Sequence, residues 1–220
     1  MLDCRTNRLF AFGYRLFAVG YRLFAFGYLL SAFGFSATIM TQHPIKNQFN
    51  PSYTMQPQVS ILYEQWQIML HWVNGNLNNL SNQHLSQTVL PNDNHGVWIL
   101  GHLIASDDDL ALYMGKGDLL FPTYQQLFGA GSTVQPIENY PPIDVLRQHW
   151  KSVCDKNEQL YQSLTDAELD ETHALHKEGS PPDFYNTKKR VLICWHLHQV
   201  HHAGQLALIR SVAKKQPLSA

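Results

Sequence analysis

A group of histidines near the carboxyl end of the chain is the feature most able to do chemistry. The segment HLHQVHHAGQ, residues 196–205, holds four of the twelve histidines in the sequence: His196, His198, His201 and His202. Histidine is the commonest metal ligand in proteins, and its proton affinity lies close to neutral pH. Four histidines so close together therefore indicate a metal site or an acid–base site.

The apolar residues around this segment follow helical spacing and predict a helix over about 187–214. At about 100° per residue, His198 and His202 fall in the middle of the apolar stripe, where two imidazoles at i and i+4 can bind one ion. His201 falls at the edge of the stripe, and His196 points roughly 160° away, toward solvent. The alternative is a pair of buried histidines that are only hydrogen-bonded to neighbours. Two of them on one apolar face are harder to satisfy in that way, which favours a metal.

A third ligand would have to come from a facing helix. The segment 94–114 predicts such a helix, with Asn94 as its N-cap, and His102 lies in the middle of its apolar face. Three imidazoles with an open fourth position are typical of catalytic zinc sites, whereas structural sites use four protein ligands. An ion bound in this way can lower the pKa of a water or a thiol.

Four further residues are expected around these ligands: Asp109, Cys194, His201 and Gln205. Cys194 precedes His198 by one helical turn and is either a fourth ligand or a small core residue. Gln205 lies within the stripe, where it can hydrogen-bond a ligand imidazole or tie the helix to a loop. Asp109 returns to the face of the second helix that carries the histidine, whereas the rest of the SDDDL segment, residues 106–110, is expected on a solvated face. Three other histidines are expected at the surface or in loops: His149, His173 and His176.

The remaining elements predict an all-α four-helix bundle. Helical spacing of apolar residues extends over 59–80 and resumes after Pro142 to about 164, in addition to the two helices described above. No segment sustains period-two alternation, so no substantial sheet is expected. The connection over 119–142 is long and rich in proline and glycine, which predicts that it crosses one end of the bundle or covers a site.

The amino-terminal segment differs from the rest of the chain. Residues 8–35 repeat a seven-residue unit of the type RLFAFGY four times, with a glycine in each unit. We expect residues 1–39 to be a repetitive extension that is disordered or not native, with Met40 as the start, 40–56 as a linker and 57–214 as the bundle domain. The alternative is a signal or membrane anchor, because residues 23–40 are uncharged and about as long as the shortest spanning helix.

The overall composition excludes several classes of protein. Sixteen basic against seventeen acidic residues give a net charge of −1, so there is no basic excess for binding nucleic acid. Three scattered cysteines do not form a disulfide framework. These features argue against a nucleic-acid-binding protein and against a disulfide-stabilised fold, and we expect a cytoplasmic protein.

The histidine pattern resembles the DinB/YfiT-like family of metalloenzymes. The resemblance rests on the histidine within WILGHLIASDDDLALYMG followed by HxxxHxGQ in HQVHHAGQ, and it extends over roughly 59–214, including NHGVWILGHL and YPPIDVL. It implies an up-down-down-up bundle, a homodimer and a divalent metal, often zinc or nickel. The ligands implied by the matching positions are His102, His198 and His202.

The resemblance also implies an activity. Family members include transferases that join a low-molecular-weight thiol to an electrophile, and an isomerase that depends on a thiol. A metal that holds the thiol as thiolate, the reactive nucleophile, fits a three-histidine site. The alternative function is that of a non-catalytic metal-binding stress-response protein on the same fold.

Overall fold

The computed structural model describes residues 55–88, 94–177 and 185–215. Four long helices dominate this part of the chain: α3 (Pro57–Leu77), α5 (Gly96–Asp108), α8 (Ile143–Ser163) and α10 (Lys188–Lys215). Shorter helices connect them: α4 (Asn82–Leu85), α6 (Leu110–Met114), α7 (Tyr124–Phe128), the 3-10 helix η3 (Ile137–Asn139) and α9 (Asp166–Leu169). The described residues form no named strand, so the prediction of an all-α fold is confirmed.

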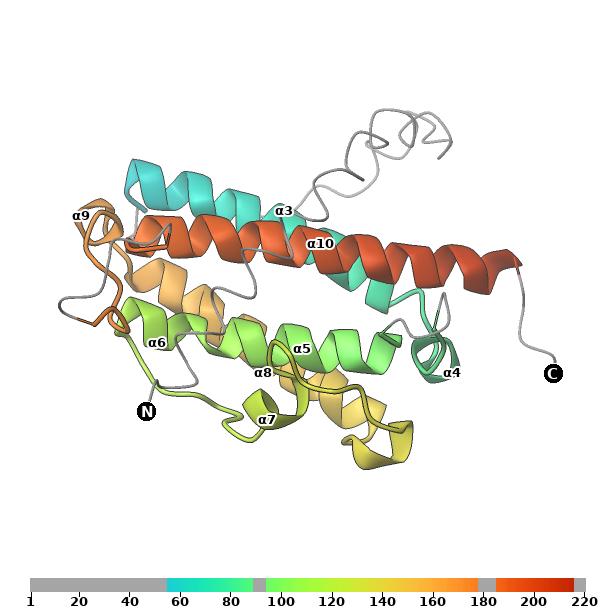
Figure 1. Cartoon of the computed structure of the whole chain (residues 1–220). Coiled ribbons are helices and arrows are strands. Elements are labelled where there is room, and N and C mark those ends of the chain that lie inside the picture. The colour runs from blue at the N-terminus through green and yellow to red at the C-terminus, as the bar shows by residue number, and fades with distance from the viewer. Residues whose placement is uncertain (1–54, 89–93, 178–184, 216–220) are drawn as a thin grey trace, which may run out of the picture. The chain divides into compact units, whose positions relative to one another are not determined.

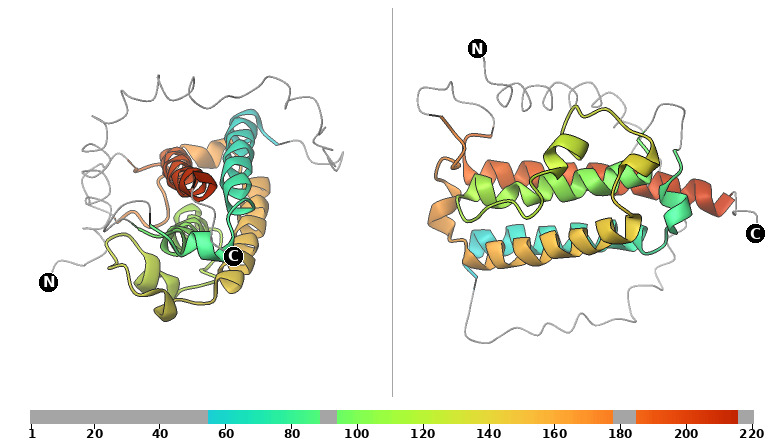
Figure 2. Two further views of the ribbon diagram at one scale, coloured as in Figure 1. Left: turned by 90° about the vertical axis from the view of Figure 1, so that its right-hand side faces the viewer. Right: turned by 90° about the horizontal axis from the view of Figure 1, so that it is seen from below.

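The four long helices form an up-down-down-up bundle. Helices α3 and α10 run in one direction, and α5 and α8 run in the other (Figure 1). Seen along the bundle, the helices follow one another around the core in the order α3, α10, α5 and α8 (Figure 2). The closest pairs are α10 with α3 and α5 with α8. Helix α10 therefore lies between α3 and α5.

The repeat over 8–35, the uncharged stretch 23–40 and all but the last two residues of the expected linker 40–56 lie outside the described residues. Within the described ranges, no helix combines the length and the apolar character that crossing a bilayer requires.

The boundaries of the second helix differ from the prediction. Its N-cap is His95 rather than Asn94, because the Nδ1 atom of His95 accepts a hydrogen bond from the backbone N–H of Trp98 at 3.0 Å. The helix also breaks at Asp109, which ends α5 and precedes α6. Imidazole nitrogen caps the orphan N–H as a carboxylate or hydroxyl would.

The prediction of a solvated face for the SDDDL segment is wrong at its first two aspartates. Asp107 and Asp108 are both fully buried. The Asp108 carboxylate accepts hydrogen bonds from the backbone N–H groups of Leu120 and Phe121, and it pairs with Lys156 of α8. The connection after α6 and the helix α8 together cover this end of α5, so its outer side is not free.

The long connection after α6 packs against α5 through a close contact. Phe128, at the end of α7, lies over Gly101 so tightly that a Cβ atom there would approach the phenyl ring to 2.2 Å. Any side chain at position 101 would push α7 away from α5. Gly101 thus allows α7 to lie directly behind the residue that follows it, His102.

Candidate metal centre

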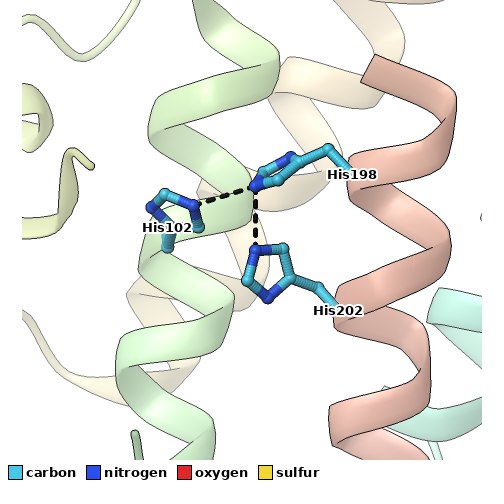
Figure 3. Close-up of side chains that lie close together, drawn as sticks. All are labelled: His102, His198 and His202. Atoms are coloured by element: carbon cyan, nitrogen blue, oxygen red, sulfur yellow. Dashed lines mark hydrogen bonds between the residues drawn. The ribbon is translucent and has the colours of Figure 1, made fainter. Parts of the chain in front are cut away.

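Three imidazoles meet between α5 and α10 (Figure 3). His102 projects from the middle of α5, and His198 and His202 project from successive turns of α10. The Nε2 atom of His198 lies 2.9 Å from Nε2 of His102 and 2.8 Å from Nε2 of His202. Each side chain is only 5–6% exposed. The structure therefore brings together the three histidines that the sequence singled out.

The hydrogen-bond partners of the Nδ1 atoms, on the outer side of the cluster, determine which nitrogen of each imidazole carries the proton. Nδ1 of His102 lies 2.6 Å from the backbone carbonyl oxygen of Phe128, and a carbonyl can only accept. Nδ1 of His202 lies 2.7 Å from Oε1 of Gln205. Both Nδ1 atoms therefore donate, and in a neutral imidazole the Nε2 atom is then left with a lone pair. This is the usual arrangement around metal-bound histidines.

The inner nitrogens, the three Nε2 atoms, share too few protons for a hydrogen bond in each of the two short contacts. Burial lowers the pKa of all three imidazoles, and the neighbouring histidines lower it further, so the neutral forms are favoured. His198 can place at most one proton between its Nε2 and the two facing lone pairs. At least one short N···N contact is therefore left without a hydrogen bond of its own.

A cation bound between the three Nε2 atoms would accept these lone pairs. Two ligand nitrogens, each about 2.1 Å from one tetrahedral zinc ion, lie about 3.4 Å apart. The Nε2 separations of 2.9 and 2.8 Å are shorter than this, so the imidazoles would have to move apart by about half an ångström to admit the ion. The buried donor set therefore fits a divalent metal held by His102, His198 and His202.

Aromatic residues and the connection after α6 support the first of these ligands. The Trp98 indole stacks on the His102 ring with centroids 4.7 Å apart and planes 9° apart. Trp98 in turn donates its indole N–H to the hydroxyl of Ser132 at 3.2 Å. The connection over 119–142 therefore fixes the orientation of this imidazole through Phe128 and Ser132, which agrees with the prediction that it covers a site.

The four residues expected around the ligands differ in whether they contact the three histidines. Gln205 contacts a ligand directly, as described above, whereas His201 is exposed at the edge, with its ring 5.0 Å from that of His202. Asp109 accepts a hydrogen bond from Gln125 at 2.9 Å. Cys194 is a buried free thiol whose pKa is raised to about 11 by burial, and it is not among the converging metal-binding groups of the described residues.

The structure corrects the prediction for His196. Its side chain is 2% exposed rather than solvated. Its Nε2 accepts a hydrogen bond from the Tyr161 hydroxyl at 2.6 Å, and its Nδ1 donates to Oε1 of Gln65 at 2.9 Å. Burial lowers the pKa of His196 to about 4. The helical-phase prediction assumed one buried face, but α10 is covered by α3 and α8 as well as by α5.

His173 is buried as well, contrary to the expectation of a surface position. Its ring packs 5.1 Å from that of Tyr113, and its backbone N–H donates to the carbonyl of Asn186. His149 is half-buried and hydrogen-bonded to the hydroxyl of Tyr124 at 2.8 Å. Tyr113 of α6 and Asn186, just before α10, are among the residues that enclose His173.

A buried polar cluster formed by Asp107, Gln199 and Asn157 was not predicted from the sequence. The Asp107 carboxylate accepts a hydrogen bond from the side-chain amide of Gln199, and its backbone carbonyl accepts one from Asn157 at 3.0 Å. Burial raises the pKa of Asp107 to about 8. One side-chain oxygen of each of these three residues finds no hydrogen-bond donor in the described part of the chain. The uncharged sequence over 191–209 is a signal that α10 is covered on several sides.

The fold and the histidine cluster define an all-α bundle with a three-histidine centre between its second and fourth long helices. Residues 61–206, well over half of the chain, match the DinB superfamily, and the chain belongs to that family. A search of curated proteins finds no match.

A solved structure shares the fold of this chain. The crystal structure of a conserved protein from Enterococcus faecalis is similar over 73% of this chain and 99% of its own, with a TM-score of 0.56 and 13% sequence identity. At this level of identity the likeness concerns the fold alone.

Proposed function

We propose that the protein binds one divalent ion, zinc or nickel, through His102, His198 and His202, and that it is a metal-dependent thiol S-transferase. The observation that carries the first part is the convergence of three buried Nε2 atoms with too few protons to join them. The second part rests on the ligand count, since three protein ligands leave a position for a substrate.

The chemistry follows from these ligands. When bound, the ion would act as a Lewis acid that favours the thiolate form of a low-molecular-weight thiol. The thiol loses its proton to solvent, and its sulfur forms a bond to the electrophilic carbon of the second substrate while the leaving group departs with its electron pair. The chain itself holds His102 and His202 in one tautomer, through Phe128 and Gln205, and the burial of all three imidazoles limits access of water.

Other features of the chain are consistent with small-molecule substrates in the cytoplasm. Cys154 and Cys194 are free thiols, as is usual in a reducing compartment. The near balance of acidic and basic residues gives no support for nucleic acid as a partner.

A conjugation assay tests the proposal. Protein stripped of metal and reloaded with zinc or nickel is mixed with glutathione, bacillithiol or mycothiol and with 1-chloro-2,4-dinitrobenzene as electrophile. We expect thioether formation with at least one thiol, lost in the stripped protein and in the variant His198→Ala. Reloaded protein that binds the ion but shows no turnover with any thiol would contradict the transferase part.

The alternative function is metal binding without catalysis. The specific observation that favours it is the low exposure of the ligands, which leaves little surface for a second substrate. In that case the ion would bind tightly in the same assay, and neither the thiols nor the electrophile would compete with it.

A further inference from the structure

A groove runs between α3 and α8, on the side of the bundle away from the metal centre. Around the core, the pair formed by α8 and α3 lies opposite the pair formed by α10 and α5 (Figure 2). The groove has a volume of about 370 Å³, and every residue that lines it lies on α3, on α8 or directly after α3. We refer to it as the α3–α8 groove. Its volume falls within the range of roughly 300–1,000 Å³ that is typical of small-molecule sites.

Hydrogen bonds between the two helices close both ends of the α3–α8 groove. At one end, the Arg147 guanidinium donates to the backbone carbonyl of Leu77 at 3.0 Å. At the other end, the Tyr63 hydroxyl donates to the Glu158 carboxylate at 3.1 Å. These contacts hold α3 and α8 at a fixed separation. The groove is therefore formed before any ligand binds, which lowers the cost of binding.

The floor of the α3–α8 groove is aromatic. Trp66 and Trp150 are 2% and 4% exposed, and Leu70 and Cys154 lie half-buried about one turn further along the two helices. The indole N–H of Trp150 is already bonded to the side-chain oxygen of Asn74 at 2.8 Å. Aromatic side chains accept a flat ring in stacked or edge-to-face contact. The lining therefore favours an aromatic ligand.

The indole N–H of Trp66 is a buried donor that lacks an acceptor. Tyr161 stacks on the Trp66 ring with centroids 5.0 Å apart, but in the described part of the chain no oxygen accepts a hydrogen bond from this N–H. An indole N–H can only donate, and a buried donor without an acceptor costs free energy. Because Trp66 lines the groove, a ligand with an oxygen acceptor could supply the missing partner.

The charged residues at the rim of the α3–α8 groove balance one another. All four of them lie on α8, where Arg147 and Lys151 precede Asp155 and Glu158. The Lys151 ammonium pairs with the Asp155 carboxylate at 2.6 Å. Two positive and two negative side chains give the lining no net charge. The groove therefore does not select for a charged ligand.

We propose that the α3–α8 groove binds a neutral, flat aromatic molecule whose carbonyl oxygen accepts a hydrogen bond from the Trp66 indole N–H. None of the three metal-binding histidines is among the residues that line the groove. Binding in the groove therefore does not require the ion, and it is independent of the proposed transferase activity.

Titration of the nitrogen-15-labelled full-length protein with coumarin, a neutral aromatic lactone, tests this proposal. We expect the indole N–H resonance of Trp66 to shift until it saturates, with a dissociation constant of about 1 mM or below. The indole N–H resonance of Trp98, which lies beside the metal centre, should not move. His198→Ala should bind coumarin as tightly as the wild type does.

Single variants identify the groups that bind the ligand. Trp66→Phe keeps an aromatic ring but removes the donor, and it should weaken coumarin binding by about 10-fold in calorimetry. The matched control is Trp72→Phe, since Trp72 lies on the same helix, is 51% exposed and does not line the groove. This control should bind coumarin as the wild type does. Cys154→Met places a longer side chain in the groove and should prevent binding, with unchanged helical circular dichroism.

Three results would overturn the proposal. The first is the absence of a saturable shift in the wild type. The second is a shift of the Trp98 resonance in place of Trp66, which would assign coumarin to the metal centre. The third is a folded Trp66→Phe or Cys154→Met variant that binds coumarin as tightly as Trp72→Phe does.

Discussion

Helix α10 carries buried histidines on two sides, and the two sides differ in how their nitrogens are satisfied. His196 has a hydrogen-bond partner for each ring nitrogen, the hydroxyl of Tyr161 and the amide oxygen of Gln65. On the other side, Nε2 of His198 and of His202 face each other and a third histidine. Histidines on both sides are buried, so burial does not identify a metal ligand. The balance of hydrogen-bond donors and acceptors around each imidazole identifies it.

The largest expected effect follows from removing a ligand. His102→Ala, His198→Ala or His202→Ala should each lower metal affinity by more than about 100-fold, since even the supporting partners of ligands are worth about 10–100-fold. Metal per chain after dialysis against a weak chelator measures this. A variant of the three that retains a full equivalent would show that its histidine is not a ligand.

The second prediction concerns Asp107, the buried carboxyl group of α5 that accepts a hydrogen bond from Gln199 of α10. The pKa of Asp107 is raised to about 8 by burial, from 3.8, so the folded state holds its proton more tightly than the unfolded state. Stability should therefore decrease as the pH rises from about 4 to about 8, by as much as a few kcal/mol, and then level off.

Asp107→Asn provides the matched control for this pH dependence. The amide replaces the carboxyl with a group that stays neutral and can donate to the unpartnered oxygen of Asn157 or Gln199. The variant should be more stable than the wild type at pH 9, and its stability should change less between pH 5 and pH 9. Parallel curves of unfolding free energy for the two proteins would refute this assignment.

The third prediction concerns His196, whose removal should change stability rather than metal content. His196→Ala should keep the full metal content but lose about 1–3 kcal/mol of stability, because the buried hydroxyl of Tyr161 loses its acceptor. Urea unfolding and metal analysis of the same sample separate the two effects. Loss of metal without loss of stability would mean that the two sides of α10 have been assigned the wrong roles.

A smaller effect is expected at Gln205, which orients one ligand. Gln205→Ala removes the acceptor for Nδ1 of His202 and should lower metal affinity by about 10-fold. His201→Ala is the control, because His201 is exposed at the edge of the cluster and should leave affinity nearly unchanged. Competition with a coloured chelator compares the two variants, and equal losses would contradict the distinction between them.

The sequence predicted the bundle and the histidine cluster because both depend on helical periodicity. His102, His198 and His202 lie on apolar stripes, and residues one turn apart on a stripe must face the same neighbour. His196 and Asp107 were misplaced for the opposite reason. A single stripe predicts one buried side, whereas α10 and the end of α5 are covered by several elements. The carbonyl of Phe128 was beyond prediction, because its position depends on how the connection after α6 packs against Gly101.

The measurement that tests the central claim most directly is X-ray absorption at the metal edge of protein reloaded with one equivalent of zinc. We predict three imidazole nitrogens at about 2.0–2.1 Å and a remaining light ligand from solvent. The same spectrum should be lost in His198→Ala and retained in His196→Ala. A spectrum with fewer than three imidazoles, or with sulfur at about 2.3 Å, would contradict the three-histidine centre.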